Sequence, residues 1–189
     1  MKQALVLNES EFKRVIAIVR NGQHAARNEV ALCLSYWAGL RVCEIASLTI
    51  GDVYELDGKV RTCVALTNKQ TKGNEGRQFI LSNRLKRLLE QYRPHITRID
   101  TGKPLIASQK SGKHFSANSL CQLFGRIYQR TGIAGASSHS GRRTFITKLA
   151  NRSVNAKVIM SLAGHKHLGT TQRYIEVNQQ QLIGRILRN

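Results

Sequence analysis

Apolar residues recur every three to four positions in four stretches of the chain, a spacing typical of amphipathic helices with one buried face. The four apolar sets are Phe12/Val15/Ile16/Val19, Val30/Cys33/Leu34/Trp37, Leu85/Leu88/Leu89/Tyr92 and Leu120/Leu123/Phe124/Ile127. We therefore expect four helices before residue 130, each packed against a common core.

Polar residues and a glycine mark the ends of these patterns. Asn8, with Glu11 three residues later, is a variant of the capping box that starts many helices. Ser82 and Ser116 precede the third and fourth patterns, where a hydroxyl can accept hydrogen bonds from the first free amides. Gly39 follows the second pattern and predicts the end of that helix.

Two shorter stretches favour β-structure. Residues 59–66 place Val60, Thr62, Val64 and Leu66 at period two, as on one face of a strand. Residues 78–81 form a second strand candidate, and residues 68–76 would be their turn. After residue 137 the pattern is helical again, while residues 95–114 are the least regular. We expect a mainly α fold with a small antiparallel β-sheet, an α+β arrangement.

The charge of the chain narrows the choice of partner. It carries 30 Lys and Arg against 11 Asp and Glu, a formal charge of +19 spread along all 189 residues, which suits one compact domain with a basic surface. Such a surface attracts a polyanion. No apolar run approaches the ~20 residues that span a bilayer, and the N-terminus lacks a signal-peptide core. We therefore expect nucleic acid, and not a membrane, as the partner.

The four cysteines, Cys33, Cys43, Cys63 and Cys121, form no CxxC pair with metal-ligand spacing. We expect buried free thiols, which together with the missing signal sequence predict a reducing cytoplasm. We also expect association with the nucleoid.

Five short motifs carry the candidate chemistry. In chain order they are Gly39-Leu40-Arg41-Val42-Cys43-Glu44, Thr71-Lys72-Gly73-Asn74, His139-Ser140-Gly141-Arg142, Leu162-Ala163-Gly164-His165 and Thr170-Thr171-Gln172-Arg173-Tyr174. Together they resemble the phage integrase or tyrosine recombinase family. That family places an Arg in a GLR-x-x-E motif, a Lys in a β-hairpin, an HxxR box, a GH box, and a Tyr nine residues after the His of the GH box. The six matching catalytic positions are Arg41, Lys72, His139, Arg142, His165 and Tyr174.

The resemblance covers roughly residues 7–177 and implies a tyrosine recombinase catalytic-domain fold. Residue 1 lies close to the start of that domain. We expect residues 1–189 to be a single catalytic domain without the family's N-terminal core-binding domain. The chain is then either an excised domain or a single-domain member similar to the fimbrial phase-switch recombinases. Residues 22–28 resemble the N-terminal region of those recombinases.

The resemblance implies DNA cleavage through a covalent 3′-phosphotyrosine, and the residue types fit that chemistry. Attack on a phosphodiester needs positive donors around the phosphate and a proton for the leaving oxygen. Arg41 and Arg142 offer charged, fork-shaped donors. Tyr174 is the implied nucleophile, and its phenol, with an ordinary pKa of about 10, needs nearby cations to act as phenolate.

The remaining site residues have supporting roles by resemblance. His139 is expected to assist proton transfer, and His165 to donate a hydrogen bond to a nonbridging oxygen. Lys72 is the candidate general acid for the leaving 5′ oxygen, with Lys69 on the same turn as its alternative. Glu44 is expected to support the Arg41 region.

The expected function is site-specific recombination, such as integration, excision or inversion. Because the phosphotyrosyl bond conserves the energy of the broken phosphodiester, we expect no ATP or other high-energy cofactor. The few acidic residues lie scattered along the chain, so we expect no metal site of the two-metal nuclease type either. The alternatives are a type IB topoisomerase, with a similar site, and a catalytically inactive DNA-binding regulator.

The expected partners are double-stranded DNA, further copies of the chain in a synaptic tetramer on DNA, and an accessory DNA-bending protein. An apolar stripe is formed by Leu182, Ile183, Ile186 and Leu187. The resemblance implies that it docks on a neighbouring protomer, and the alternative is that it folds back onto its own core.

Overall fold

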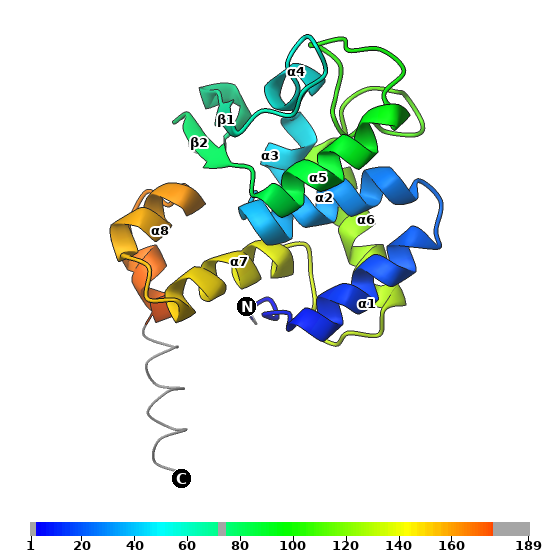
Figure 1. The fold of residues 1–189 in the computed structure, drawn as a ribbon. Helices are drawn as coiled ribbons and strands as arrows, with labels where there is room; N and C mark the ends of the chain where they lie inside the picture. Colours follow the sequence, from blue (N-terminus) through cyan, green and yellow to red (C-terminus); the bar gives the residue numbers. More distant parts are fainter. Residues whose placement is uncertain (1–2, 72–74, 176–189) are drawn as a thin grey trace, which may run out of the picture.

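Helices dominate the described part of the chain, which comprises residues 3–71 and 75–175 of a computed structural model (Figure 1). The helices are α1 (Glu9–Arg20), α2 (Ala25–Ala38), α3 (Val42–Ser47), α4 (Ile50–Val53), α5 (Asn83–Tyr92), α6 (Ala117–Arg130), α7 (Ser140–Asn151) and α8 (Ala156–Ala163). The strands are β1 (Cys63–Leu66) and β2 (Arg77–Ile80), and two 3-10 turns are η1 (Asn68–Gln70) and η2 (Arg93–His95). Residues 168–175 are also helical. The expected fold, mainly helical with a small antiparallel sheet, is confirmed.

The predicted helix ends are confirmed in atomic detail. Asn8 and Glu11 exchange side-chain to backbone hydrogen bonds of 2.8 and 2.7 Å in a capping box. Ser82 and Ser116 accept from the amides of the first turns of α5 and α6. Gly39 ends α2 in the left-handed region at φ 67°, where a side chain would be strained and would also strike Phe145.

The sheet is a two-stranded antiparallel pair and is shorter than predicted. Cys63 pairs with Ile80 and Leu66 with Arg77. The alternating pattern from residue 59 is not one strand, because Val60 forms an isolated bridge with Tyr54 and the Arg61 amide donates to the Val53 carbonyl. These contacts turn residues 60 and 61 toward α4, and the ladder begins only at Cys63.

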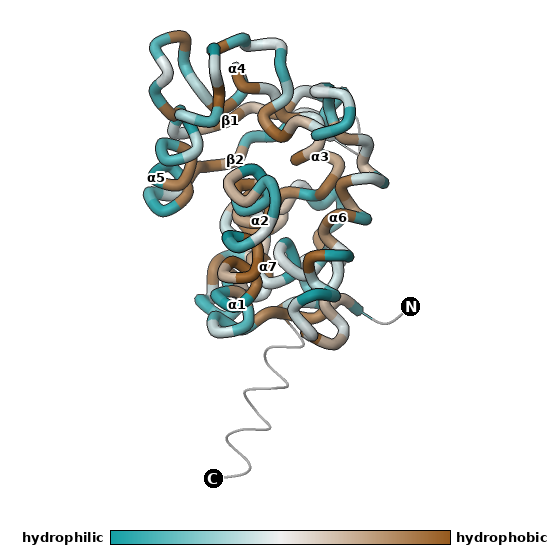
Figure 2. Tube along the Cα trace, turned by 90° about the vertical axis from the view of Figure 1, so that its right-hand side faces the viewer, coloured by the Kyte–Doolittle hydropathy of each residue, from teal (hydrophilic) through white to brown (hydrophobic). Residues whose placement is uncertain are grey.

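The long helix α2 lies at the centre of the molecule, with α1, α5 and α7 packed around it (Figure 1). Nearly all of its side chains are buried, so its apolar pattern is less one-sided than that of α1. Hydrophobic stretches gather in this interior, while the outer loops beside α4 are mostly hydrophilic (Figure 2). A second, smaller cluster of buried residues lies between α7 and α8.

Some features were not predicted. The short helices α3 and α4 have too few turns to show a period, and the expectation that all cysteines are buried was wrong. Cys33 is buried, Cys43 and Cys121 are half-buried, and Cys63 is exposed on the hairpin, although all four are free thiols. No helix in the described residues is long and apolar enough to cross a membrane. Residues 182–187, with the predicted apolar stripe, lie outside the described residues.

Candidate active site

Two predicted arginines reach the site from different helices. Arg41 directly precedes α3, where Gly39 has turned the chain out of α2, and its side chain is 24% exposed. Arg142 lies in the first turns of α7 and is buried. Its two terminal nitrogens donate to the carbonyl oxygens of Gly39 and Ala163, each at 2.6 Å. Arg142 therefore links Gly39, two residues before Arg41, to the last residue of α8.

A carboxylate with no solvent exposure, Glu44 of α3, holds this arrangement together. Arg77 donates to both of its oxygens, at 3.1 and 2.7 Å, and the Arg41 side chain donates to one at 3.0 Å. The Arg41 amide adds a further bond of 2.7 Å. Burial alone raises the pKa of Glu44, but the Arg77 hydrogen bonds and the surrounding positive charge outweigh it and lower that pKa. Glu44 is thus ionised. It supports the Arg41 region as predicted, through direct hydrogen bonds to Arg41.

Three arginines cap the end of α8. Arg77 donates to the Leu162 carbonyl at 2.8 Å, Arg142 to that of Ala163, and Arg41 to that of Gly164 at 2.7 Å. The last carbonyls of a helix lack partners within it and carry partial negative charge, so guanidinium groups are well suited to this position. The end of α8 is therefore held against the arginines.

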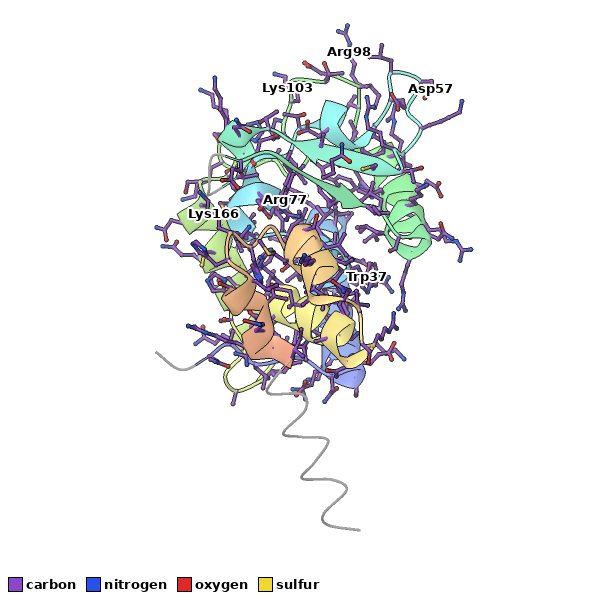
Figure 3. The ribbon with its side chains drawn as sticks, turned by 90° about the vertical axis from the view of Figure 1, so that its left-hand side faces the viewer. Trp37, Asp57, Arg77, Arg98, Lys103 and Lys166 are labelled. Atoms are coloured by element: carbon purple, nitrogen blue, oxygen red, sulfur yellow. The ribbon has the colours of Figure 1, made fainter. Side chains whose placement is uncertain are left out.

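Arg77 was missed by sequence reasoning. It begins β2 and lies between the hairpin and α8 (Figure 3), with its side chain only 8% exposed. A Cβ atom on Gly164 would come within 2.5 Å of the Arg77 side chain, so the glycine of the GH box permits this close approach. No local pattern separates Arg77 from the other basic residues of a chain with a charge of +19.

His165 follows the left-handed turn at Gly164 and is half-buried. Its Nδ1 lies 2.9 Å from the hydroxyl of Thr171, a buried residue that the sequence did not single out. Burial and the charges of Arg142, Arg41 and Arg77 lower the pKa of His165 to about 4. The imidazole is therefore neutral near pH 7 and has one N–H donor.

Tyr174 lies on the helical segment 168–175 and is half-buried. Its ring stacks at 6.2 Å from that of His165, and the Arg143 guanidinium lies 5.9 Å from its ring centroid. The other four tyrosines are buried, and burial raises the pKa of Tyr54, Tyr92 and Tyr128. Tyr174 is therefore the tyrosine whose side chain is accessible from solvent.

Residues of this cluster line two open depressions. One, of about 480 Å³, is lined by His139, Arg142, Arg143 and Tyr174 among others. The other, of about 710 Å³, is lined by residues that include Arg41, Arg77 and His165. His139, just before α7, is exposed. The structure thus brings together the five predicted site residues that lie within the described residues.

Lys72 lies outside the described residues. Thr71, next to it in sequence, lines the larger depression, and Lys69 is exposed on η1. The choice between the two lysines stays a prediction.

Positive charge dominates the site. Burial lowers the pKa of Arg142 to about 9, with repulsion from Arg41 as the next cause, and this value still leaves the group charged near pH 7. Glu44 is the carboxylate that contacts Arg41 and Arg77, so the arginines together exceed its charge. Among the described residues, no three His, Cys, Asp or Glu side chains gather as metal ligands. The arrangement suits a bound phosphate.

The chain is similar in sequence to proteins named as tyrosine recombinases. The chain is 27% identical over 180 residues to tyrosine recombinase XerC of Lactobacillus leichmannii, covering 92% of this chain and 59% of that protein. It is 29% identical over 179 residues to tyrosine recombinase XerA of Pyrococcus horikoshii, covering 93% of this chain and 58% of that protein. The chain thus spans somewhat over half the length of these relatives.

Solved structures share the fold. A crystal structure of XerA recombinase superposes with a TM-score of 0.77 at 22% identity, covering 100% of this chain and 66% of that one. XerH site-specific recombinase in a post-cleavage complex with a palindromic difH substrate gives 0.71 at 20% identity, covering 96% and 52%. The profile of the phage integrase family matches residues 6–181. The chain, matched over most of its length, therefore belongs to the phage integrase family.

Proposed function

We propose that this chain cleaves and rejoins DNA strands as a site-specific recombinase, through a covalent 3′-phosphotyrosyl intermediate at Tyr174. One observation carries the proposal: the tyrosine that is not buried lies beside His165, in a cluster whose arginines Arg41 and Arg142 exceed the charge of its carboxylate. Such a cluster stabilises both a phenolate and the charge that develops on an attacked phosphate.

The proposed cleavage step follows from these positions. The Tyr174 hydroxyl gives up its proton as its oxygen attacks phosphorus, the bond from phosphorus to the 5′ oxygen breaks, and the 5′ oxygen takes up a proton and leaves as a hydroxyl. Arg41 and Arg142 donate to the nonbridging oxygens in place of some of the carbonyl contacts they make here. His165 adds a further donor, and His139, exposed beside Tyr174, assists proton transfer.

Rejoining is the same step in reverse. A 5′ hydroxyl attacks the phosphotyrosyl bond, the phosphodiester forms again, and the proton returns to the Tyr174 oxygen. One phosphoester bond is exchanged for another in each direction, so the proposed reaction needs no ATP.

DNA is the proposed partner, and the +19 charge supports it. Solved structures of the same fold include XerH bound to difH substrate and a lambda integrase dimer bound to a core site. We extend the proposal to assembly of several protomers, as a synaptic tetramer, on paired sites. DNA affinity should fall steeply between about 50 and 200 mM salt, and a flat response would contradict the proposed phosphate contacts.

A suicide substrate with a nick close to the cleavage site tests the covalent step. The unmodified protein should form an adduct that resists denaturant, and Tyr174→Phe should bind DNA equally well and form none. Tyr92→Phe is the matched control, because Tyr92 is buried away from the site and donates to the Leu105 carbonyl. An adduct with Tyr174→Phe, or none with the unmodified protein, would refute the proposal.

The general acid is proposed to be Lys72. Lys72→Ala should slow cleavage, and replacing the leaving 5′ oxygen by sulfur should restore most of the rate, because a thiolate needs little protonation to leave. Lys69→Ala should show a weaker loss without this selective rescue. The opposite pattern would assign the role to Lys69.

A further inference from the structure

Thr171, on the helical segment 168–175, is a polar residue that lies buried beside His165. The residue has no solvent exposure, and its Oγ1 lies 2.9 Å from Nδ1 of His165. Within residues 3–71 and 75–175, this is the hydrogen bond that the hydroxyl makes. A buried hydroxyl aimed at one ring nitrogen constrains which nitrogen carries the proton.

The direction of this bond follows from counting donors and acceptors. A hydroxyl has one proton and two lone pairs, whereas a neutral imidazole has one N–H and one bare nitrogen. If Nδ1 donated, the Thr171 proton would stay buried without an acceptor among the described residues, which is energetically costly. If the hydroxyl donates, both groups are satisfied. Nδ1 of His165 is therefore the acceptor.

The proton of the neutral ring then lies on the other nitrogen, Nε2. Because Thr171 occupies Nδ1, Nε2 is the ring nitrogen available to a ligand in the depression shared with Arg41. We infer that Thr171 is a positioning residue that fixes His165 in the Nε2–H tautomer and so presents an N–H donor to the phosphate. This inference rests on the proposed function only for the identity of the ligand.

The same bond links the histidine to the nucleophile. Thr171 precedes Tyr174 by one helical turn in segment 168–175, and the Tyr174 ring stacks on His165. When this segment packs against His165, it therefore positions the tyrosine and orients the histidine together.

The tautomer can be measured directly without DNA. Nitrogen NMR of the histidine rings distinguishes a protonated ring nitrogen from a bare one. His165 in the unmodified protein should have a bare, hydrogen-bonded Nδ1 and a protonated Nε2. Thr171→Val, which has nearly the same shape and no hydroxyl, should lose the hydrogen-bonded Nδ1 signal, and Thr171→Ser should retain it. Thr170→Val, at the neighbouring exposed threonine, should leave the His165 signals unchanged.

The functional consequence is tested by a double-mutant cycle. Thr171→Val should slow single-turnover cleavage by roughly tenfold at saturating DNA, as expected for the loss of one hydrogen bond. Thr171→Ser should restore most of that rate. In a His165→Ala background, Thr171→Val should have no further effect, because no imidazole remains to be oriented.

Three results would overturn the inference: a protonated Nδ1 in the unmodified protein, unchanged cleavage by Thr171→Val, or an equal loss in the His165→Ala background. The last would indicate a role in packing alone. A protein that forms no adduct at all but shows the expected ring signals would refute the proposed function and leave the tautomer assignment standing.

Discussion

The two halves of the candidate site stand on hydrophobic cores of very different size. Arg41 and Glu44 belong to α3 and its flanks, which pack into the large cluster shared by α1, α2, α5, α6 and the hairpin. Tyr174 packs instead against the second cluster, whose buried members are Ile146, Ala150, Ile159 and Ala163. The arginine half is thus part of the main core, while the nucleophile rests on a small one.

This difference indicates which half of the site moves more easily. Burial stabilises in proportion to the apolar area removed from water, so a cluster of four buried and five partly buried residues holds its segment more weakly than the main core holds α3. Polar contacts add to this, through the three guanidinium groups that cap α8 at Leu162, Ala163 and Gly164. A segment held this way opens at lower free energy than the global unfolding of the domain. We expect the tyrosine half to open and close on a fixed arginine half.

The largest expected effect comes from Arg142, which bridges the two halves. Arg142→Ala should reduce single-turnover cleavage by at least about 100-fold, because it removes a donor to the proposed phosphate and both carbonyl contacts. Arg152→Ala, at the exposed end of the same helix, is the control and should cleave normally. Equal cleavage rates for the two variants would show that Arg142 takes no part in the reaction.

Glu44→Gln should destabilise the arginine half strongly. Removing the carboxylate leaves Arg41 and Arg77 without their counter-charge in a buried position, which costs about 3–5 kcal/mol. Urea unfolding measures this loss. Glu55→Gln removes an exposed partner of Arg61 and should cost no more than about 1 kcal/mol. If Glu44→Gln loses as little unfolding free energy as the control, Glu44 does not hold Arg41 and Arg77 in place.

A substitution that creates a cavity in each core compares the local stability of the two halves. Leu34→Ala in the main core should accelerate amide hydrogen exchange throughout the domain, with a cost of about 2–5 kcal/mol. Ile159→Ala in the small cluster should cost about 2 kcal/mol and accelerate exchange in α8 and residues 168–175, leaving α2 protected. Uniform acceleration by Ile159→Ala would show that the two clusters unfold as one.

The smallest expected effect concerns pH. His165 has a lowered pKa of about 4 in the folded protein, so as pH falls below its ordinary value of about 6.5 the unfolded chain takes up a proton that the folded chain does not. Stability from this group is therefore complete above about pH 6.5 and declines toward pH 4. The fall in Tm between about pH 7 and 5 should be smaller in His165→Gln than in the unmodified protein. An equal fall would mean that His165 does not keep this low pKa.

Much of the fold could be predicted from residues that act locally. The caps at Asn8, Ser82 and Ser116 depend on neighbours a few residues away, and these predictions are confirmed. The strand prediction from residue 59 was too long because Val60 and Arg61 pair with the α4 region instead. That competition comes from the tight turn at Gly58, which brings Val60 and Arg61 back onto Tyr54 and Val53, and the spacing of apolar residues alone does not show it.

The site was predictable only where it lies in short motifs. Arg41, His139, Arg142, His165 and Tyr174 were identified from motifs in order, and the structure brings them into one region. Arg77 and Thr171 were not identified as site residues. Their partners, Glu44 for Arg77 and Nδ1 of His165 for Thr171, are set by folded geometry, which no spacing along the chain displays.

Peptide mapping of the complex trapped on a suicide substrate tests the central claim most directly, because it locates the covalent bond instead of inferring it from a loss of activity. The account predicts a DNA fragment attached through its 3′ phosphate to Tyr174, the tyrosine that is not buried. Attachment to any other residue, or a protein that binds the substrate without forming a bond, would contradict it.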